Sequence, residues 1–321
     1  MARRQTSDAA PGTPEAGSLV GADWLEACRR MVAAQRELFS RERGIAARTV
    51  YDGVGEGGDH SLAIDRRSED IVFAELEHLH ADGYDFTAIS EERGEVAFGS
   101  AGNGTAVIVD PLDGSLNARR MLPSFSLSLA VASGPTMADV EVAFVHDFGS
   151  GDEYFARRGE GASLDGEELR ARGPGFGLEV VGIEGAKPER LIPVLDALQG
   201  KAYRMRSVGS IAISLCYVAG GRFDAMMTGR ASRSVDAAAG QLIAREAGAE
   251  VAFAGDGLDV GLDLDARYHV AAALDGEMLA TVLQAQRFAE RAPEGERVRK
   301  QPQRPSGTAA ADSEPPPEVD A

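Results

Sequence analysis

The chain has 321 residues, a length that suits one large α/β unit or two domains of ordinary size. Hydrophobic residues make up 44% of it, enough for a sizeable core, and the formal net charge is −18. A body this acidic repels nucleic-acid phosphates unless cations intervene, so we expect no nucleic-acid partner. The two cysteines, Cys28 and Cys216, exclude a disulfide framework and a four-cysteine zinc site. Since no secretory signal and no long apolar run occur, we expect a cytoplasmic protein without a membrane partner.

Both ends of the chain are polar and rich in small residues, and the C-terminal end is also rich in proline. Such segments bury too little apolar surface to offset their ordering entropy. We therefore expect disordered tails over residues 1–17 and 291–321. Residues 18–290 are expected to form the folded unit, with an α+β half over 18–175 and an α/β half over 176–290.

Hydrophobic spacing predicts the elements between the tails. Near-helical spacing predicts two helices, over residues 22–42 and 62–80. Short apolar runs predict the next strands, at residues 86–89, 105–109, 125–132 and 140–148. Tyr154 and the turn-rich stretch after it predict a hairpin. Helices are then expected at 188–199, 210–219, 235–247 and 276–290, and strands near 179–183, 223–227 and 268–273. This order favours an α/β (α+β) fold in which sheets lie between layers of helices.

The densest chemical signal is the segment V-I-V-D-P-L-D-G-S-L-N at residues 107–117. A buried type of strand is expected to end at Val109, and Asp110 and Asp113 follow it three residues apart. Pro111 fixes one φ angle and Gly114 permits a tight bend, so a turn here can direct both carboxylates toward one point. Hard cations such as Mg²⁺ prefer oxygen ligands of this kind. An ordinary Asp-Pro and Asp-Gly turn is the alternative interpretation.

Three further acidic segments carry weaker signals. Glu91 and its neighbour Glu92 follow an expected strand, at the edge where sites gather in α/β folds. Asp236 heads a helix-forming run, where it serves either as a helix N-cap or in binding phosphate at the helix N-terminus. Asp65 lies on an expected helix and by itself is an ordinary surface acid.

Together and in this order, these segments resemble the inositol monophosphatase family of Mg²⁺-dependent, lithium-sensitive phosphomonoesterases. The matching segments are Asp65–Glu69, Ser90–Glu92, Asp110–Asn117, Arg206–Ser210 and Asp236–Gly240. The resemblance runs over roughly residues 20–290 and is strongest to the archaeal-type branch, which handles inositol phosphates and fructose 1,6-bisphosphate. It implies a layered α-β-α-β-α sandwich, commonly a homodimer.

The resemblance also implies site residues and two or three Mg²⁺ ions per subunit. The implied metal ligands are Glu91, Asp110, the carbonyl of Leu112, Asp113 and Asp236. The implied catalytic residues are Asp65, Ser115 and Glu91, with the Ser115 hydroxyl paired to Asp65 to orient the attacking water. The expected substrate contacts are Asp113, Gly114, Ser115, Gly209, Ser210, Arg230 and Asp236.

The expected reaction is hydrolysis of a small phosphorylated polyol or sugar, with inositol monophosphate as the first choice. Val235 stands where many members of the family have tryptophan, and Arg230 and Arg233 follow an apolar strand where a carboxylate occurs in some inositol-specific members. Arginines there suit a second phosphate, although surface arginines are the alternative. Fructose 1,6-bisphosphate, 3′-phosphoadenosine 5′-phosphate and histidinol phosphate therefore stay open as substrates. A non-catalytic ligand-binding relative is the remote alternative.

Overall fold

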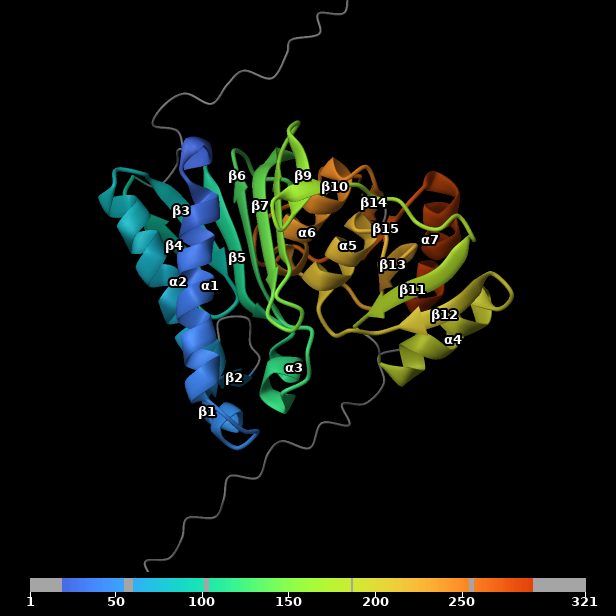
Figure 1. Cartoon of the computed structure of the whole chain (residues 1–321), viewed down its shortest axis with the longest axis horizontal. Coiled ribbons are helices and arrows are strands. Elements are labelled where there is room, and N and C mark those ends of the chain that lie inside the picture. Colours follow the sequence, from blue (N-terminus) through green and yellow to red (C-terminus); the bar gives the residue numbers. More distant parts are fainter. Residues whose placement is uncertain (1–18, 55–59, 101–103, 186, 254–256, 291–321) are drawn as a thin grey trace, which may run out of the picture.

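The structure is a computed structural model that describes residues 19–54, 60–100, 104–185, 187–253 and 257–290. The tails expected to be disordered, residues 1–17 and 291–321, lie outside the described residues. Figure 1 shows five layers, in which helices and sheets alternate across the molecule. The expected layered sandwich is confirmed. None of the described helices is long and apolar enough to cross a membrane.

The first sheet has eight strands in the order β10-β9-β8-β7-β6-β5-β3-β4. Its strands are β3 (Phe86–Ser90), β4 (Gly94–Phe98), β5 (Ala106–Asp113), β6 (Ser126–Ala132), β7 (Val140–Asp147), β8 (Glu153–Arg157), β9 (Gly161–Leu164) and β10 (Glu167–Leu169). Neighbours are antiparallel except β3 and β5, which run parallel. Two helices cover one face: α1 (Trp24–Arg41) and α2 (Ala63–Ala81). A separate ribbon of β1 (Tyr51–Val54) and β2 (His60–Leu62) precedes α2.

The central strand β5 shows why this sheet lies between two helical layers. Successive side chains of a strand point to opposite faces. Val107 and Val109 accordingly pack with α1 and α2, whereas Ile108 packs with the helices on the other side. Both faces are apolar, so the sheet is covered on both.

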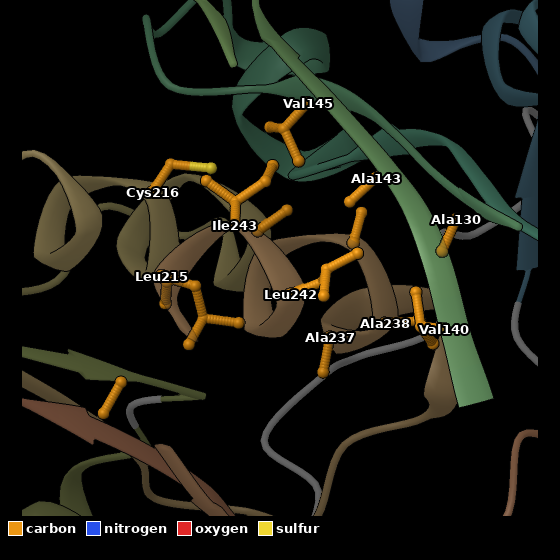
Figure 2. Packing of buried hydrophobic residues seen from close by; sticks show 14 of the residues in the cluster. Ala130, Val140, Ala143, Val145, Leu215, Cys216, Ala237, Ala238, Leu242 and Ile243 are labelled. Carbon is orange, nitrogen blue, oxygen red and sulfur yellow. The ribbon is translucent and has the colours of Figure 1, made fainter. Parts of the chain in front are cut away.

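The middle layer consists of α5 (Ile211–Ala219) and α6 (Ser234–Glu246). Figure 2 shows small and branched side chains of α6 between the first sheet and α5. The packed residues are Ala237, Ala238, Leu242 and Ile243 of α6, Ala130, Val140, Ala143 and Val145 of the sheet, and Leu215 and Cys216 of α5. Gly240 permits the close approach of the two helices, because a Cβ there would lie 2.8 Å from the Leu215 Cβ. The packing sets where the N-terminus of each helix points.

The second sheet has five strands in the order β12-β11-β13-β15-β14. These strands are β11 (Leu178–Glu184), β12 (Ala202–Arg206), β13 (Ala225–Thr228), β14 (Glu250–Phe253) and β15 (Val270–Ala273). The outer face is covered by α4 (Pro188–Leu198) and α7 (Gly276–Glu290). Since β11 is parallel to both β12 and β13, their carboxyl ends share one edge.

Two local expectations are wrong. Strand β5 does not end at Val109 but continues through Asp113, and its pairing with β6 is irregular between Asp110 and Asp113. Asp236 is not the N-cap of its helix: Arg233 is the capping residue and Asp236 is the third residue of α6. The short elements β4, β12, β14 and α3 (Ser115–Arg120) escaped the sequence pattern because each is brief and half-exposed.

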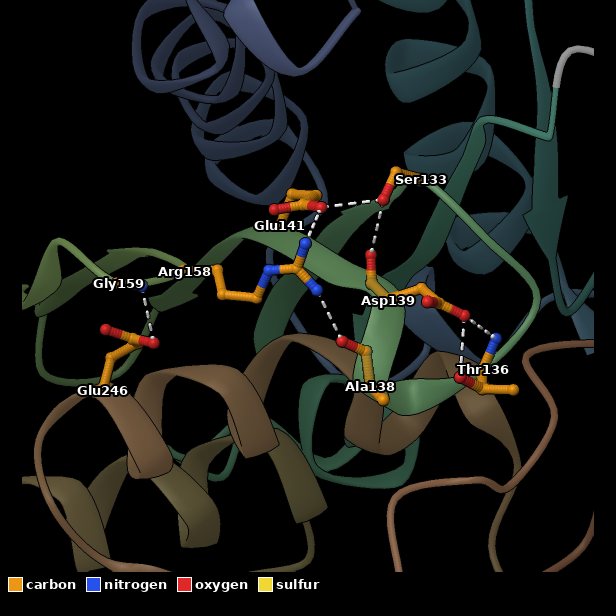
Figure 3. Close-up of polar contacts among 8 residues, drawn as sticks. All are labelled: Ser133, Thr136, Ala138, Asp139, Glu141, Arg158, Gly159 and Glu246. Carbon is orange, nitrogen blue, oxygen red and sulfur yellow. Dashed lines mark hydrogen bonds and ion pairs between the residues drawn. The ribbon is translucent and has the colours of Figure 1, made fainter. Parts of the chain in front are cut away.

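A polar network closes the end of the first sheet opposite the Asp110 motif (Figure 3). We call it the distal polar network, and its members are Ser133, Thr136, Asp139, Glu141, Arg158 and Glu246. Glu141 accepts a hydrogen bond from the Ser133 hydroxyl at 2.7 Å and forms an ion pair with Arg158. Glu246, the last residue of α6, accepts the backbone N–H of Gly159 at 3.0 Å. The network anchors the C-terminal end of α6 to the turn between β8 and β9.

Candidate active site

Strand register places the first two acidic groups side by side. Ser90 on β3 pairs with Val109 on the parallel strand β5, so the residues that follow, Glu91 just after the end of β3 and Asp110 within β5, lie next to each other. The N-terminus of α6 supplies Asp236. Single carboxylate oxygens of Glu91, Asp110 and Asp236 lie within 4.8 Å of one another. Three distant segments of the sequence therefore form one acidic cluster.

Asp113 joins this cluster from the irregular end of β5. Its Oδ2 accepts the Ser210 hydroxyl at 2.5 Å and the backbone N–H of Ala212 at 2.9 Å. Ser210 is the N-cap of α5, where its hydroxyl also accepts the Ile213 N–H at 3.1 Å. The start of α5 therefore holds Asp113 in place.

The charges of the cluster are poorly compensated. Burial, and then the carboxylates of Asp113 and Glu91, raise the pKa of Asp110 well above its usual range. Burial and the Asp236 carboxylate raise the pKa of Asp113 to about 7. Burial also raises the pKa of Glu91, although its ion pair with Arg233 opposes this shift. A bound cation would offset the repulsion among these carboxylates and the cost of burying their charge.

The donor set fits a hard divalent cation such as Mg²⁺. All the side-chain donors are carboxylate oxygens, which Mg²⁺ prefers, and no imidazole or thiolate lies among them. Among the described residues, Glu91, Asp110 and Asp236 form the group of acidic, histidine or cysteine side chains whose spacing can hold a metal ion. The predicted ligands Glu91, Asp110 and Asp236 are thus brought together.

Several residues that support the site were given no role in the sequence analysis. Glu69 is buried on α2 and accepts the hydroxyl of Ser90 and the backbone N–H of Arg93, the latter at 3.2 Å. It braces the turn that carries Glu91. The sequence contained a signal for Glu69, because it ends the matching segment Asp65–Glu69.

Glu184 supports the other side of the site. It is buried at the end of β11 and accepts the N–H groups of Val208 and Gly209, at 2.9 and 2.8 Å. Gly209 is an expected substrate contact, and its N–H is bonded to a side chain of the protein. The Ser210 hydroxyl is likewise bonded to Asp113. Nothing in the sequence pattern marks Glu184, since a strand-ending glutamate is ordinarily exposed.

Other predicted residues lie at the starts of α2 and α3. Asp65 is the third residue of α2 and half-buried, and Ser115 is the first residue of α3 and also half-buried. Gly114 precedes Ser115 with φ of 88°, and a Cβ there would lie 2.9 Å from the Ser124 carbonyl oxygen. Leu112 packs its side chain among Phe39, Ile64 and other apolar residues. The roles of the Leu112 carbonyl and of an Asp65–Ser115 pair stay predictions.

Arg230 is exposed just after β13, at the carboxyl edge of the second sheet. Its side chain lies against Gly185, where an added Cβ would be 2.5 Å from the Arg230 Cγ. Gly185 follows Glu184, which holds the Gly209 loop. Arg230 is therefore on the same edge as the α5 end of the site.

Fold and site together define a hydrolase class in which a sandwich of two sheets holds a buried carboxylate cluster for divalent cations. The family model described as "Inositol monophosphatase family" matches residues 24–291, and the chain belongs to this family. It is a phosphoric monoester hydrolase, and the family depends on Mg²⁺.

Named relatives and a solved structure agree with this assignment. The chain is 34% identical over 247 residues to the fructose-1,6-bisphosphatase/inositol-1-monophosphatase of Methanothermobacter thermautotrophicus, covering 72% of this chain and 85% of the relative. It is 34% identical over 212 residues to the inositol-1-monophosphatase of Mesorhizobium japonicum, covering 63% and 75%. A crystal structure described as an inositol monophosphatase-fructose 1,6 bisphosphatase superposes with a TM-score of 0.70 at 26% identity, covering 82% of this chain and 100% of the other.

Proposed function

We propose that this phosphatase hydrolyses inositol monophosphate, with fructose 1,6-bisphosphate as the second candidate. The observation that carries the proposal is the convergence of Glu91, Asp110 and Asp236 within 4.8 Å. A dianionic phosphate could not approach such a cluster without cations, and bound Mg²⁺ supplies both the missing positive charge and a water of lowered pKa. The printed names of the two relatives include inositol-1-monophosphatase.

We assign the cations to two groups of ligands. Glu91, Asp110 and the Leu112 carbonyl would hold one ion, and Asp110, Asp113 and Asp236 would hold a second. A third ion is compatible with the acidic character of the site. The number of ions is testable by titration calorimetry.

The chain's own residues position the water and the phosphate. The Ser115 hydroxyl accepts a hydrogen bond from the attacking water and donates a hydrogen bond to the Asp65 carboxylate. The backbone N–H groups of Gly114 and Ser115 are the phosphate donors in this proposal. The side chains of Asp113 and Asp236 are further substrate contacts in this proposal.

One observation favours fructose 1,6-bisphosphate as the second candidate. The exposed Arg230 lies on the edge that also carries Ser210, where its guanidinium can pair with a second phosphate. Inositol monophosphate has no second phosphate to use this arginine. Arg230→Met should therefore lower kcat/KM for the bisphosphate and leave inositol 1-phosphate hydrolysis unchanged. Arg204→Met, an exposed arginine of β12 that stacks on Tyr203, is the matched control.

The test of the function is phosphate release from four substrates: inositol 1-phosphate, fructose 1,6-bisphosphate, 3′-phosphoadenosine 5′-phosphate and histidinol phosphate. Each is measured with Mg²⁺ and with EDTA. We expect Mg²⁺-dependent turnover, fastest with inositol 1-phosphate. Faster turnover of another substrate would replace the substrate assignment, and turnover that survives EDTA would contradict the metal assignment. The expected homodimer and cytoplasmic location stay predictions, and sedimentation analysis checks the first.

A further inference from the structure

One polar side chain interrupts the apolar face of α1. Trp24, Cys28, Met31 and Phe39 lie on this face and are buried, and Gln35 lies among them with no exposed surface. Its Nε2 donates a hydrogen bond of 2.7 Å to the carbonyl oxygen of Pro111. Because that carbonyl can only accept, the bond also fixes which end of the amide is Nε2.

The oxygen atom of this amide makes no comparable hydrogen bond within the described part of the chain. Gln35 Oε1 is buried and has no hydrogen-bond partner among the described residues. A buried polar atom left unpaired costs about 1–3 kcal/mol, so an apolar side chain would fit this face more easily. The bond to Pro111 is therefore the contact that distinguishes glutamine from leucine or methionine here.

The Pro111 carbonyl belongs to a peptide unit that also reaches the acidic cluster. The same unit carries the N–H of Leu112, which donates to Asp110 Oδ1 at 2.9 Å. Since a peptide unit is planar, its carbonyl and its N–H turn together. One end is held by Gln35 and the other end holds the Asp110 carboxylate.

The local strand pairing cannot fix the orientation of this peptide unit. The pairing of β5 with β6 is irregular between Asp110 and Asp113, so the intervening residues lack a regular ladder partner. Pro111 also has no N–H to donate. The orientation of this peptide unit therefore depends on side chains, and Gln35 supplies the contact from α1.

We propose that Gln35 is a positioning residue of the metal site, which orients the Asp110 carboxylate through the Pro111–Leu112 peptide unit. The inference rests on the proposed metal-dependent function and adds a residue of α1 to it. Partners that orient metal ligands typically change metal affinity by about 10- to 100-fold when they are removed. Loss of the Gln35 amide should act in this range.

The experiment measures Mg²⁺ binding directly, by titration calorimetry on the substrate-free protein. Gln35→Met preserves the shape of the side chain and removes the donor. We expect its Mg²⁺ affinity to fall about 10- to 100-fold, while KM for substrate at saturating Mg²⁺ changes little. Met31→Ala is the matched control, because Met31 is buried on the same face of α1 and has no bond to the Asp110 loop. We expect this control to lose thermal stability and keep its Mg²⁺ affinity. Gln35→Leu serves if the methionine variant does not fold.

Two results would overturn the inference alone: Gln35→Met and Gln35→Leu binding Mg²⁺ as the unaltered chain does, or Met31→Ala losing as much affinity as they do. Asp110→Asn separates this failure from a failure of the proposed function. If Asp110→Asn loses Mg²⁺ binding while the Gln35 variants keep it, only the positioning role is wrong. If the unaltered chain binds no Mg²⁺, or Asp110→Asn binds it normally, the metal site and the inference both fail.

Discussion

The two ends of the eight-stranded sheet treat acidic side chains in opposite ways. In the distal polar network, Glu141 pairs with Arg158, and Glu246 caps backbone N–H groups of the β8–β9 turn. At the other end, Glu91, Asp110 and Asp236 converge, and Arg233 is the cation that pairs with one of them. The difference teaches that the distal acids hold the fold together, whereas the clustered acids are held by the fold at a cost in stability.

The largest expected effect separates catalysis at the site from structure at the distal end. Ser115→Ala should lower kcat by about 10²- to 10⁴-fold, because the attacking water loses the group that orients it and accepts its hydrogen bond. Glu141→Gln, in the distal polar network, should leave kcat unchanged. Initial-rate kinetics at saturating Mg²⁺ measures both, and an unchanged kcat in Ser115→Ala would remove this hydroxyl from the mechanism.

The next effect is a pH dependence of stability in the metal-free protein. The pKa of Asp113 is raised from 3.8 to about 7, so its protonated form favours folding. That contribution is complete below the unfolded pKa and is lost as the pH rises through about 7. Between about pH 5.5 and pH 8 the loss for Asp113 alone is on the order of 2 kcal/mol.

Chemical denaturation in EDTA at several pH values measures this slope. Mg²⁺ should flatten it, because the cation stabilises the ionised carboxylate in the folded state. Asp113→Asn should flatten it as well without metal. Stability that rises with pH across this window would contradict the account of the cluster.

A smaller effect is expected when the Asp110 carboxylate is removed from the acidic cluster. Asp110→Asn should stabilise the metal-free protein, since the amide carries no charge for burial and the Asp113 and Glu91 carboxylates to disfavour. Thermal unfolding in EDTA measures the change. Destabilisation by this variant would show that the Asp110 charge is already compensated in the folded chain.

The smallest effect is expected at the distal end. Arg158→Met should destabilise the protein by less than about 1 kcal/mol, because the Arg158 side chain is 42% exposed and such pairs contribute little. Phosphatase activity should stay unchanged. A loss of activity here would show that the distal polar network also shapes the site.

Much of the fold followed from hydrophobic period, because the long helices and the strands buried on both faces carry strong patterns. The extension of β5 through Asp113 did not, since Pro111 and the acids resemble a turn and the irregular pairing with β6 is a tertiary effect. The short edge strands β4, β12 and β14 were missed for a related reason: their half-exposed residues lack an apolar run.

The acidic residues of the site were predictable because motif order specifies them, but of their supports only Glu69, which ends a matching segment, was marked in the sequence. Gln35, Glu69 and Glu184 contact the site through backbone groups far away in the sequence, with Gln35 and Pro111 separated by 76 positions. A single sequence carries no record of such pairings. Arg230 was chosen for its charge, and the structure adds that it is exposed beside Gly185.

The most direct test of the central claim is phosphate release from inositol 1-phosphate by three proteins: the unaltered chain, Asp110→Asn and Glu141→Gln. Asp110→Asn removes one carboxylate from the acidic cluster, and Glu141→Gln removes one at the opposite end of the same sheet. Each protein is measured with Mg²⁺ and with EDTA. The account predicts Mg²⁺-dependent release by the unaltered chain and by Glu141→Gln, and none by Asp110→Asn. Full activity in Asp110→Asn, or equal loss in both variants, would contradict the claim that the clustered carboxylates hold the catalytic metal.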